Sequence, residues 1–234
     1  MKTLGLIGGM SWESTAHYYT RLNQLVGERL GGLHSARLLL YSVEFDEIQR
    51  LQHADDWDAA GRILADAARR LERAGAEAIL ICANTMHRVA PAIAAAIHIP
   101  ILSVIDATAQ AVKKQHAETV ALLGTRFTME MPFYRDALER HGLKVLTPDA
   151  GSRADIHRII FSELCKGEVK PESAQRFFEI VAGLADQGAE AAILGCTEFT
   201  LFDTSRYAGI PLFDTTEIHA RAAVAWAIRN DAGK

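Results

Sequence analysis

The sequence is poor in cysteine, in clustered basic residues and in long apolar runs. Its three cysteines among 234 residues are an odd number and widely spaced. This excludes a disulfide framework and favours a reducing compartment. None of the nine histidines stands near a cysteine at the spacing of a zinc site, so we predict no metal. No run approaches the roughly 18 apolar residues of a membrane span, and Lys and Arg are scattered along the chain. We therefore expect neither a membrane nor a nucleic-acid partner.

The first apolar run, "LGLIGGM" at 4–10, is interrupted by glycines and is followed by polar "SWES". It is too short for the core of a signal peptide and lacks a small-residue cleavage site, which predicts a cytoplasmic protein. Hydrophobic residues make up 49% of the chain and charged residues 23%, with a net charge of −4. These values are ordinary for a globular protein of one or two domains and favour a small molecule as the partner.

Short apolar runs alternate with longer segments of helical period. The longer segments include 55–74 and 173–187, in which apolar residues recur every three or four positions. This alternation is typical of an α/β protein with parallel sheets, whose strands are apolar on both faces. The expected strands cover residues 3–7, 36–42, 78–82, 101–105, 120–123, 144–146, 191–194 and 211–213.

The chain also repeats itself. "GAEAILICANTMH" at 75–87 matches "GAEAAILGCTEFT" at 188–200, and two further pairs follow in the same order: 4–10 with 120–126, and 99–112 with 210–223. The three offsets are close to one another, so the chain is predicted to contain two equivalent halves of about 115 residues. In this alignment Ala83 corresponds to Cys196.

Ligands of open α/β sheets bind beyond the carboxyl ends of the strands. The residues expected there are 8–14, 83–87, 125–128 and 196–198, which are rich in Gly, Ser, Thr and Asn. Such loops offer N–H groups and hydroxyls to a carboxylate or a phosphate. The glycines of "GLIGGM" do not have the spacing of a dinucleotide fingerprint, and no phosphate-binding P-loop motif occurs, which argues against NAD or ATP. No cofactor is expected.

Cys196 follows a predicted buried strand and precedes a predicted helix. A helix N-terminus lowers a thiol pKa from about 8.5 towards neutrality, so Cys196 is a candidate base or nucleophile. Cys165 is expected within a helical stretch as part of the core. Strand alternation points Cys82 away from the face that Ala83 occupies.

"GLIGGMSWEST", "ANTMH", "LLGTRFTM" and "LGCTE" together resemble the aspartate/glutamate racemase family, and most closely its aspartate racemase branch. The resemblance covers essentially the whole chain. It implies two similar α/β domains with parallel sheets, related by a pseudo-twofold axis, and an active site in the cleft between them. It also implies that the C-terminal segment joins the first domain, giving domains of 1–104 plus 215–234 and of 105–214. A homodimer is implied too.

In this family two cysteines flank the α-carbon of an amino acid, and no pyridoxal cofactor is used. One removes the proton from one face and the other delivers a proton to the opposite face. Cys196 matches the second of these cysteines, whereas Ala83 stands at the position of the first. Three explanations remain open: an engineered substitution, a natural replacement, or a reaction that needs one thiol only.

Several further residues match the family by position as contacts for a substrate's carboxylate and ammonium groups. They are Met10, Ser11, Asn84, Thr85, Thr125, Thr128 and Thr197. Lys166 resembles the basic residue that binds a substrate's side-chain carboxylate, and Gln52 is a weaker candidate for the same task. Lys166 indicates aspartate or glutamate as the substrate. A solvated lysine at a helix C-terminus explains it equally well.

Two alternatives to a racemase remain open at this point. The related arylmalonate decarboxylases use a single cysteine at the second position, which fits Ala83, although the first and second loops resemble the racemases more closely. The other alternative is a binder of acidic amino acids that has lost its chemistry.

Overall fold

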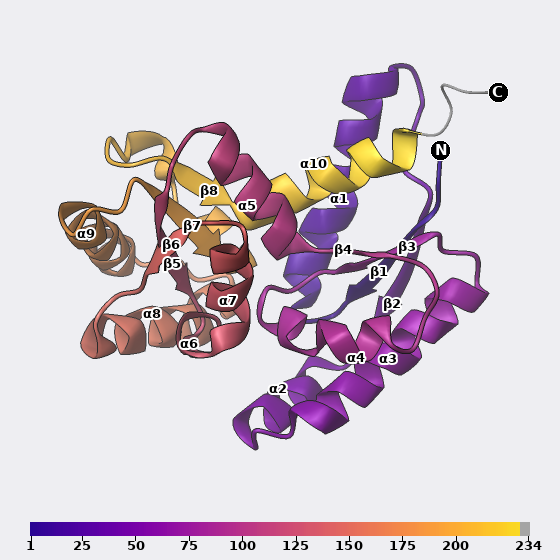
Figure 1. Ribbon diagram of the computed structural model, residues 1–234, viewed down its shortest axis with the longest axis horizontal. Coiled ribbons are helices and arrows are strands. Elements are labelled where there is room, and N and C mark those ends of the chain that lie inside the picture. The colour runs from indigo at the N-terminus through magenta and orange to yellow at the C-terminus, as the bar shows by residue number, and fades with distance from the viewer. Residues whose placement is uncertain (230–234) are drawn as a thin grey trace. The chain divides into compact units, whose positions relative to one another are not determined.

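The computed structural model describes residues 1–229, which form two compact units (Figure 1). Each unit holds one four-stranded sheet, and every strand pair in both sheets is parallel. The first sheet has the order β2-β1-β3-β4 and the second has the order β6-β5-β7-β8. The shared order confirms the two similar α/β halves expected from the repeat.

All eight predicted strands are present, with small changes at their ends. Their bounds are β1 Leu4–Gly8, β2 Leu38–Ser42, β3 Ala78–Ile81, β4 Ile101–Leu102, β5 Thr119–Gly124, β6 Lys144–Leu146, β7 Ala191–Gly195 and β8 Leu212–Asp214. The prediction of a strand over 101–105 is wrong after Leu102, because Val104 begins a helix. The apolar run alone could not separate the strand from the helix, since Val104 and Ile105 are as buried in α5 as they would be in a strand.

The helices lie between the strands, as the alternating pattern predicts. The α-helices are α1 Trp12–Leu30, α2 Phe45–His53, α3 Trp57–Arg73, α4 Ala90–Ala94, α5 Val104–Lys114, α6 Arg126–Glu130, α7 Pro132–Arg140, α8 Ala150–Ser162, α9 Pro171–Asp186 and α10 Thr215–Ile228. Short 3₁₀ helices within residues 1–229 are η1 Thr85–Val89, η2 Leu164–Lys166, η3 Thr197–Leu201 and η4 Thr204–Arg206. Side-chain caps fix several starts: Ser11, Asp56 and Asp149 each accept a backbone N–H of the first turn.

The first unit comprises residues 1–104 together with residues 219–229, and the second comprises residues 105–218. The chain therefore passes between the units twice, after Val104 and before His219. The predicted second boundary, between residues 214 and 215, coincides with the start of α10. The first turn of α10 groups with the second unit, where the Thr215 hydroxyl donates to the Leu194 carbonyl at 2.8 Å.

Each unit has its own hydrophobic core. In the first, side chains of β1 and β3 pack with Tyr18 and Leu22 of α1 and with Ala220 and Val224 of α10. In the second, side chains of β5 and β7 pack with α8, α9 and a group of phenylalanines around Phe177. Burial of these apolar faces is the main force that holds each layer of helices on its sheet.

Glycines at the strand ends bring the following helices close to the sheets. A Cβ on Gly8 would lie 2.4 Å from the Thr15 side chain, and a Cβ on Gly124 would lie 3.0 Å from that of Thr128. Gly124 also pairs in register with Gly195, and a Cβ on either would lie 2.8 Å from a main-chain oxygen of the neighbouring strand. These positions need glycine because the backbones and first helical turns approach so closely.

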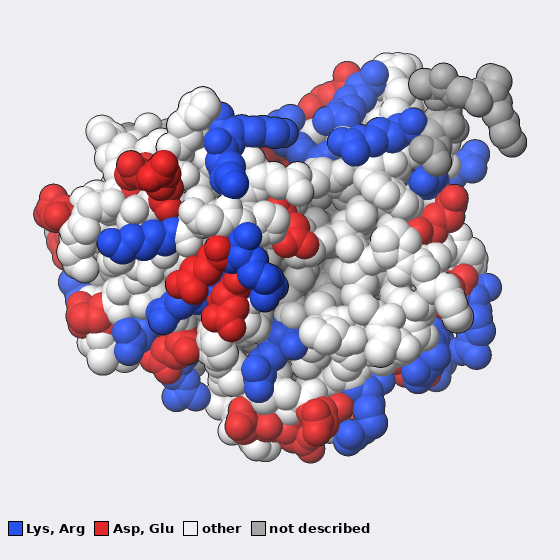
Figure 2. Space-filling view, viewed as in Figure 1, with Lys and Arg blue, Asp and Glu red and all other residues white. Residues whose placement is uncertain are grey.

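Acidic and basic side chains are interspersed on the face of the molecule shown in Figure 2, in keeping with the scattered basic residues of the sequence. Among residues 1–229, no helix is both long enough and apolar enough to cross a membrane.

Candidate active site

The first candidate loop joins β1 to α1 and is ordered by short-range hydrogen bonds. The Ser11 hydroxyl caps α1 by accepting from the Ser14 N–H at 3.3 Å. The Thr15 hydroxyl accepts from the Gly9 N–H at 2.8 Å and donates to the Ser11 carbonyl at 2.7 Å. Met10 and Ser11 are both buried. The loop is thus held in one shape with the N-terminus of a 19-residue helix directly behind it.

The second candidate loop follows β3 and contains the alanine that the repeat aligns with Cys196. Ala83, Asn84 and Thr85 are all buried, and Thr85 begins η1. Gln52 of α2 is buried as well, and its amide donates to the Met86 sulfur at 3.0 Å. The structure therefore brings Gln52, the weaker candidate for the substrate's side-chain carboxylate, against the second loop.

The third candidate loop follows β5. Thr125 caps α6 by accepting from the Thr128 N–H at 3.3 Å, and the two hydroxyls lie 3.3 Å apart. Both threonines are buried. As in the first unit, the loop after the first strand of the repeat presents hydroxyls and the start of a helix at the carboxyl edge of the sheet.

The fourth candidate loop follows β7 and holds the thiol. The Cys196 thiol donates to Glu198 Oε2 at 2.9 Å, and the Thr197 hydroxyl donates to the same oxygen at 2.8 Å. Cys196 and Thr197 are each 8% exposed. One carboxylate oxygen thus accepts two hydrogen bonds from the two residues that precede it.

The predicted lowering of the Cys196 pKa is wrong for this structure. Burial and then the nearby Glu198 carboxylate raise the pKa of this thiol well above its ordinary value. The helix that begins after it is a five-residue 3₁₀ turn, and Cys196 forms no side-chain cap with it. A short turn cannot offset desolvation and a neighbouring negative charge, so the resting thiol is protonated.

Sequence reasoning assigned no role to Glu198. The repeat contained a signal, because Glu198 aligns with the uncharged Thr85 and is therefore one of the places where the two halves differ in charge. The structure shows that this carboxylate is the immediate neighbour of the thiol. Glu198 can accept the proton of the Cys196 thiol, and so generate a thiolate, when a bound ligand alters the charge around this pair.

Removing the charge of Glu198 should make Cys196 more acidic. In Glu198→Gln we expect the pKa of the Cys196 thiol to fall, since a like charge next to an ionising group raises its pKa. The pH dependence of alkylation by iodoacetamide in a Cys165→Ser background measures this shift. Glu139→Gln, which removes an exposed carboxylate of α7, is the control. An unchanged profile in Glu198→Gln would show that burial alone sets the thiol's pKa.

The segment with Cys165 and Lys166 lies next to this loop. Helix α8 ends at Ser162, so the two residues lie in the short turn η2, and the expectation of one continuous helix here is wrong. Cys165 packs against the same hydrophobic cluster as Cys196 and contributes to raising the pKa of Cys196. Lys166 is exposed. Lys166, the predicted basic residue, therefore directly follows Cys165, whose side chain packs in the same cluster as the Cys196 thiol.

The segment is anchored by Glu163, whose carboxylate is buried. It accepts from Arg158 at 2.9 Å and lies 3.7 Å from the Lys170 ammonium. Its carbonyl also accepts the N–H groups of Lys166 and Glu168. These bonds close the chain into a loop that carries Lys166.

Cys82 takes no part in either loop. It is fully buried in the core of the first unit beside residues of α1 and α10, and burial raises the pKa of its thiol. This is the position that strand alternation predicts for it.

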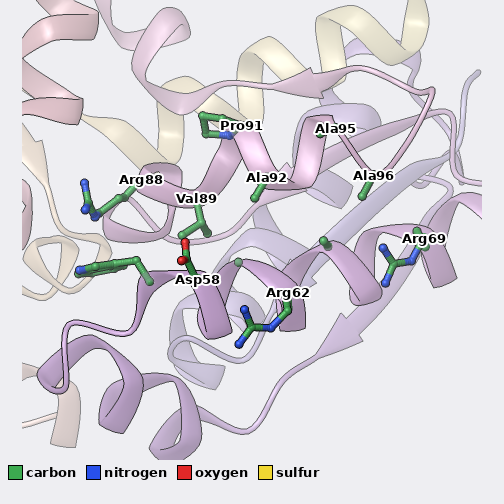
Figure 3. A pocket seen from close by; sticks show the side chains of 12 residues that line it. Asp58, Arg62, Arg69, Arg88, Val89, Pro91, Ala92, Ala95 and Ala96 are labelled. Atoms are coloured by element: carbon green, nitrogen blue, oxygen red, sulfur yellow. The ribbon is translucent and has the colours of Figure 1, made fainter.

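A separate groove with a volume of about 820 Å³ lies between α3 and α4 (Figure 3). Ala92, Ala95 and Ala96 line its α4 side, and Arg88 and Arg69 stand towards its two ends. None of the candidate site residues lines it. Among residues 1–229 no three His, Cys, Asp or Glu side chains are grouped so that they could hold a metal ion.

Residues 7–223 match the family described as Asp/Glu/Hydantoin racemase. A Yersinia pestis protein with a provisional Asp/Glu racemase assignment is 50% identical, with a TM-score of 0.91 over 97% of this chain and 100% of that one. An aspartate racemase homologue from Pyrococcus horikoshii is 36% identical, with a TM-score of 0.85 over 97% and 99% of the two chains.

A curated relative is the broad-specificity amino-acid racemase RacX of Bacillus subtilis. It is 22% identical over 94% of this chain and 96% of its own length. The family match spans nearly the whole chain and both sheets, and it includes all four candidate loops. This chain is therefore a member of the Asp/Glu/Hydantoin racemase family.

Proposed function

We propose that this protein transfers protons at the α-carbon of acidic amino acids without a cofactor, with Cys196 as the thiol that carries out the transfer. The observation that carries the proposal is the hydrogen bond from Cys196 to the Glu198 carboxylate, at the carboxyl end of β7. Ala83 stands at the equivalent end of β3, in the second loop of the other repeat. The chain therefore has one proton-transfer group where a racemase of this family needs two.

The proposed step begins when the Cys196 thiol gives its proton to Glu198. The thiolate then takes the α-proton of the bound amino acid, and the electron pair of the broken C–H bond moves into the α-carboxylate to form an enediolate. Return of a proton from the same thiol restores the same enantiomer. Because protons on sulfur and on a carboxylate exchange with water, the product carries a solvent hydrogen without inversion.

The enediolate needs hydrogen-bond donors, since no cofactor withdraws its electrons. The first and third loops supply the candidates, with the start of α1 behind Ser11 and the start of α6 behind Thr125. Asn84, Thr85 and Thr197 add polar groups beside the two positions that correspond to the thiols. We assign the binding of the α-carboxylate and ammonium groups to these residues.

We assign the side-chain carboxylate of the substrate to Lys166, with Gln52 as the second candidate. If this is correct, Lys166→Met should weaken the binding of aspartate by about 10- to 100-fold, which is what loss of a charge-assisted hydrogen bond costs. Binding of alanine, which lacks that carboxylate, should be unaffected. Titration calorimetry with both amino acids measures the effect, and Lys114→Met is the control with the same change of charge. Equal loss for aspartate and alanine would refute the assignment.

A decarboxylase of malonate-like acids is the second candidate, because it needs a single thiol and Ala83 is compatible with it. An assay of carbon dioxide release from a disubstituted malonate, run beside an assay of α-hydrogen exchange on aspartate and glutamate, separates the two reactions. We expect exchange and no carbon dioxide. Binding of acidic amino acids with neither reaction would instead identify a non-catalytic binder. The homodimer and the cytoplasmic location stay predictions.

A further inference from the structure

The second candidate loop is attached to the place where the chain first leaves the first unit. His87 of η1 is 5% exposed, and its Nδ1 lies 2.9 Å from the carbonyl oxygen of Ala83. Its Nε2 lies 3.2 Å from the N–H of Val104, the last residue of the first unit before the chain passes to the second. One imidazole therefore links the backbone of Ala83 to that of Val104, where the chain first leaves the first unit.

The two hydrogen bonds fix the protonation of this ring. A carbonyl oxygen can only accept, so Nδ1 of His87 carries the hydrogen, and an N–H can only donate, so Nε2 is unprotonated. His87 is therefore neutral, in a single tautomer. A second proton on Nε2 would oppose the Val104 N–H and break the link.

A second histidine holds the point at which the chain returns. His219, the first residue of the first unit after the second passage, is fully buried. Its Nε2 donates to the Leu102 carbonyl at 2.7 Å and its Nδ1 accepts from the Tyr18 hydroxyl at 3.0 Å. The rings of His87 and His219 are 6.2 Å apart between centroids and lie edge to face. Leu102 and Val104 are two residues apart, so the two rings hold neighbouring parts of one strand-to-helix turn.

We infer that His87 and His219 form a buried pair that fixes both passages of the chain to the loop carrying Ala83, and that His87 is a positioning residue for the proton transfer proposed above. The link is direct, because the Ala83 carbonyl belongs to the residue whose Cβ marks the missing base. A shift of this turn moves that Cβ. Proton transfer tolerates little displacement, since about 1 Å of misplacement can cost 10²-fold in rate.

Substitutions at His87 test the inference because they separate its hydrogen bonds from its bulk. His87→Leu removes both bonds, whereas His87→Gln supplies an amide N–H for Ala83 and an amide oxygen for Val104. In His87→Leu the backbone amide of Val104 should exchange with solvent about tenfold faster, the factor expected for one lost hydrogen bond. Residues 84–87 should also lose protection, and His87→Gln should restore both. Exchange monitored by NMR gives these values without any assay of activity.

Arg88→Gln is the matched control. Arg88 is the next residue of the same turn, but its guanidinium lies over the Trp57 ring at 5.1 Å, at the edge of the groove between α3 and α4 (Figure 3). This variant changes η1 without touching the histidine links, so protection of Val104 should stay unchanged. If His87→Leu does not fold, Tyr18→Phe takes its place as the test. It removes only the hydroxyl that donates to His219, and the backbone around His219 should then lose protection from exchange.

The inference rests on the proposed function for its catalytic consequence alone. In an Ala83→Cys background, His87→Leu should lower kcat by about 10²-fold with KM nearly unchanged, and His87→Gln should recover most of it. If Ala83→Cys has no activity, the proposed function fails. The amide exchange of Val104 still decides whether His87 holds the two backbone segments together. Unchanged protection of Val104 in His87→Leu, or a ¹⁵N spectrum with the hydrogen of His87 on Nε2, would overturn the inference.

Discussion

The Ala83→Cys variant should invert the α-carbon of aspartate about 10²- to 10⁴-fold faster than the unmodified chain, which is the usual contribution of a positioned acid or base. Ala83 is buried, at the end of β3, in the position that corresponds to Cys196 at the end of β7. A thiol at this position supplies the second proton-transfer group that inversion requires. Chiral chromatography of L- and D-aspartate after incubation measures the gain.

Two further variants control this experiment. Ala83→Cys combined with Cys196→Ser should lose the gained activity, because the proton is again handled from one side only. Ala83→Ser should gain far less, since an alcohol is a much weaker acid than a thiol. A chain with cysteine at both positions that binds aspartate but does not invert it would contradict the assignment of these two positions.

The protein should lose stability steeply as the pH falls from about 6.5 towards 3, because burial keeps His219 neutral in the folded state over this range. Burial lowers the pKa of His219 to about 3. The unfolded chain has the ordinary value near 6.5, so below that pH it binds a proton that the folded chain does not. The full stabilisation is present above pH 6.5, and the loss amounts to about 4–5 kcal/mol near pH 3. This is a large share of the stability of a typical domain.

Urea unfolding at pH 7 and at pH 4 tests this expectation. Other groups titrate in the same range, so the informative quantity is the difference between the unmodified chain and His219→Gln. The variant should be less stable at pH 7 but should lose several kcal/mol less on acidification. His34→Gln, which changes an exposed histidine, should leave the pH dependence unaltered. Equal pH dependence in all three chains would show that His219 titrates normally.

The sequence predicts the architecture well because parallel strands carry strong local signals. β1, β3, β5 and β7 are buried on both faces, so each is a continuous apolar run that ends at a glycine or a small residue. The repeat adds a second signal, since an alignment of the chain with itself already relates Ala83 to Cys196. The largest error is at β4, which was predicted three residues too long because the apolar residues continue into α5.

The electrostatics of the site could not be predicted in the same way. The expectation of an acidic thiol at Cys196 rested on a helix N-terminus, and its failure came from the burial of the thiol and from the direction of the Glu198 side chain. Neither can be read from a strand-loop-helix pattern. The histidine pair was also invisible, since residues 87 and 219 become neighbours only when α10 packs on the first sheet.

Exchange of the α-hydrogen in D₂O, followed by NMR separately for L- and D-aspartate, tests the central claim most directly. With the unmodified chain we predict that one enantiomer gains deuterium at its α-carbon without inversion, that the other does not, and that Cys196→Ser abolishes the exchange while Cys165→Ser retains it. Binding of aspartate without exchange of either enantiomer, or exchange that survives Cys196→Ser, would contradict proton transfer by this thiol.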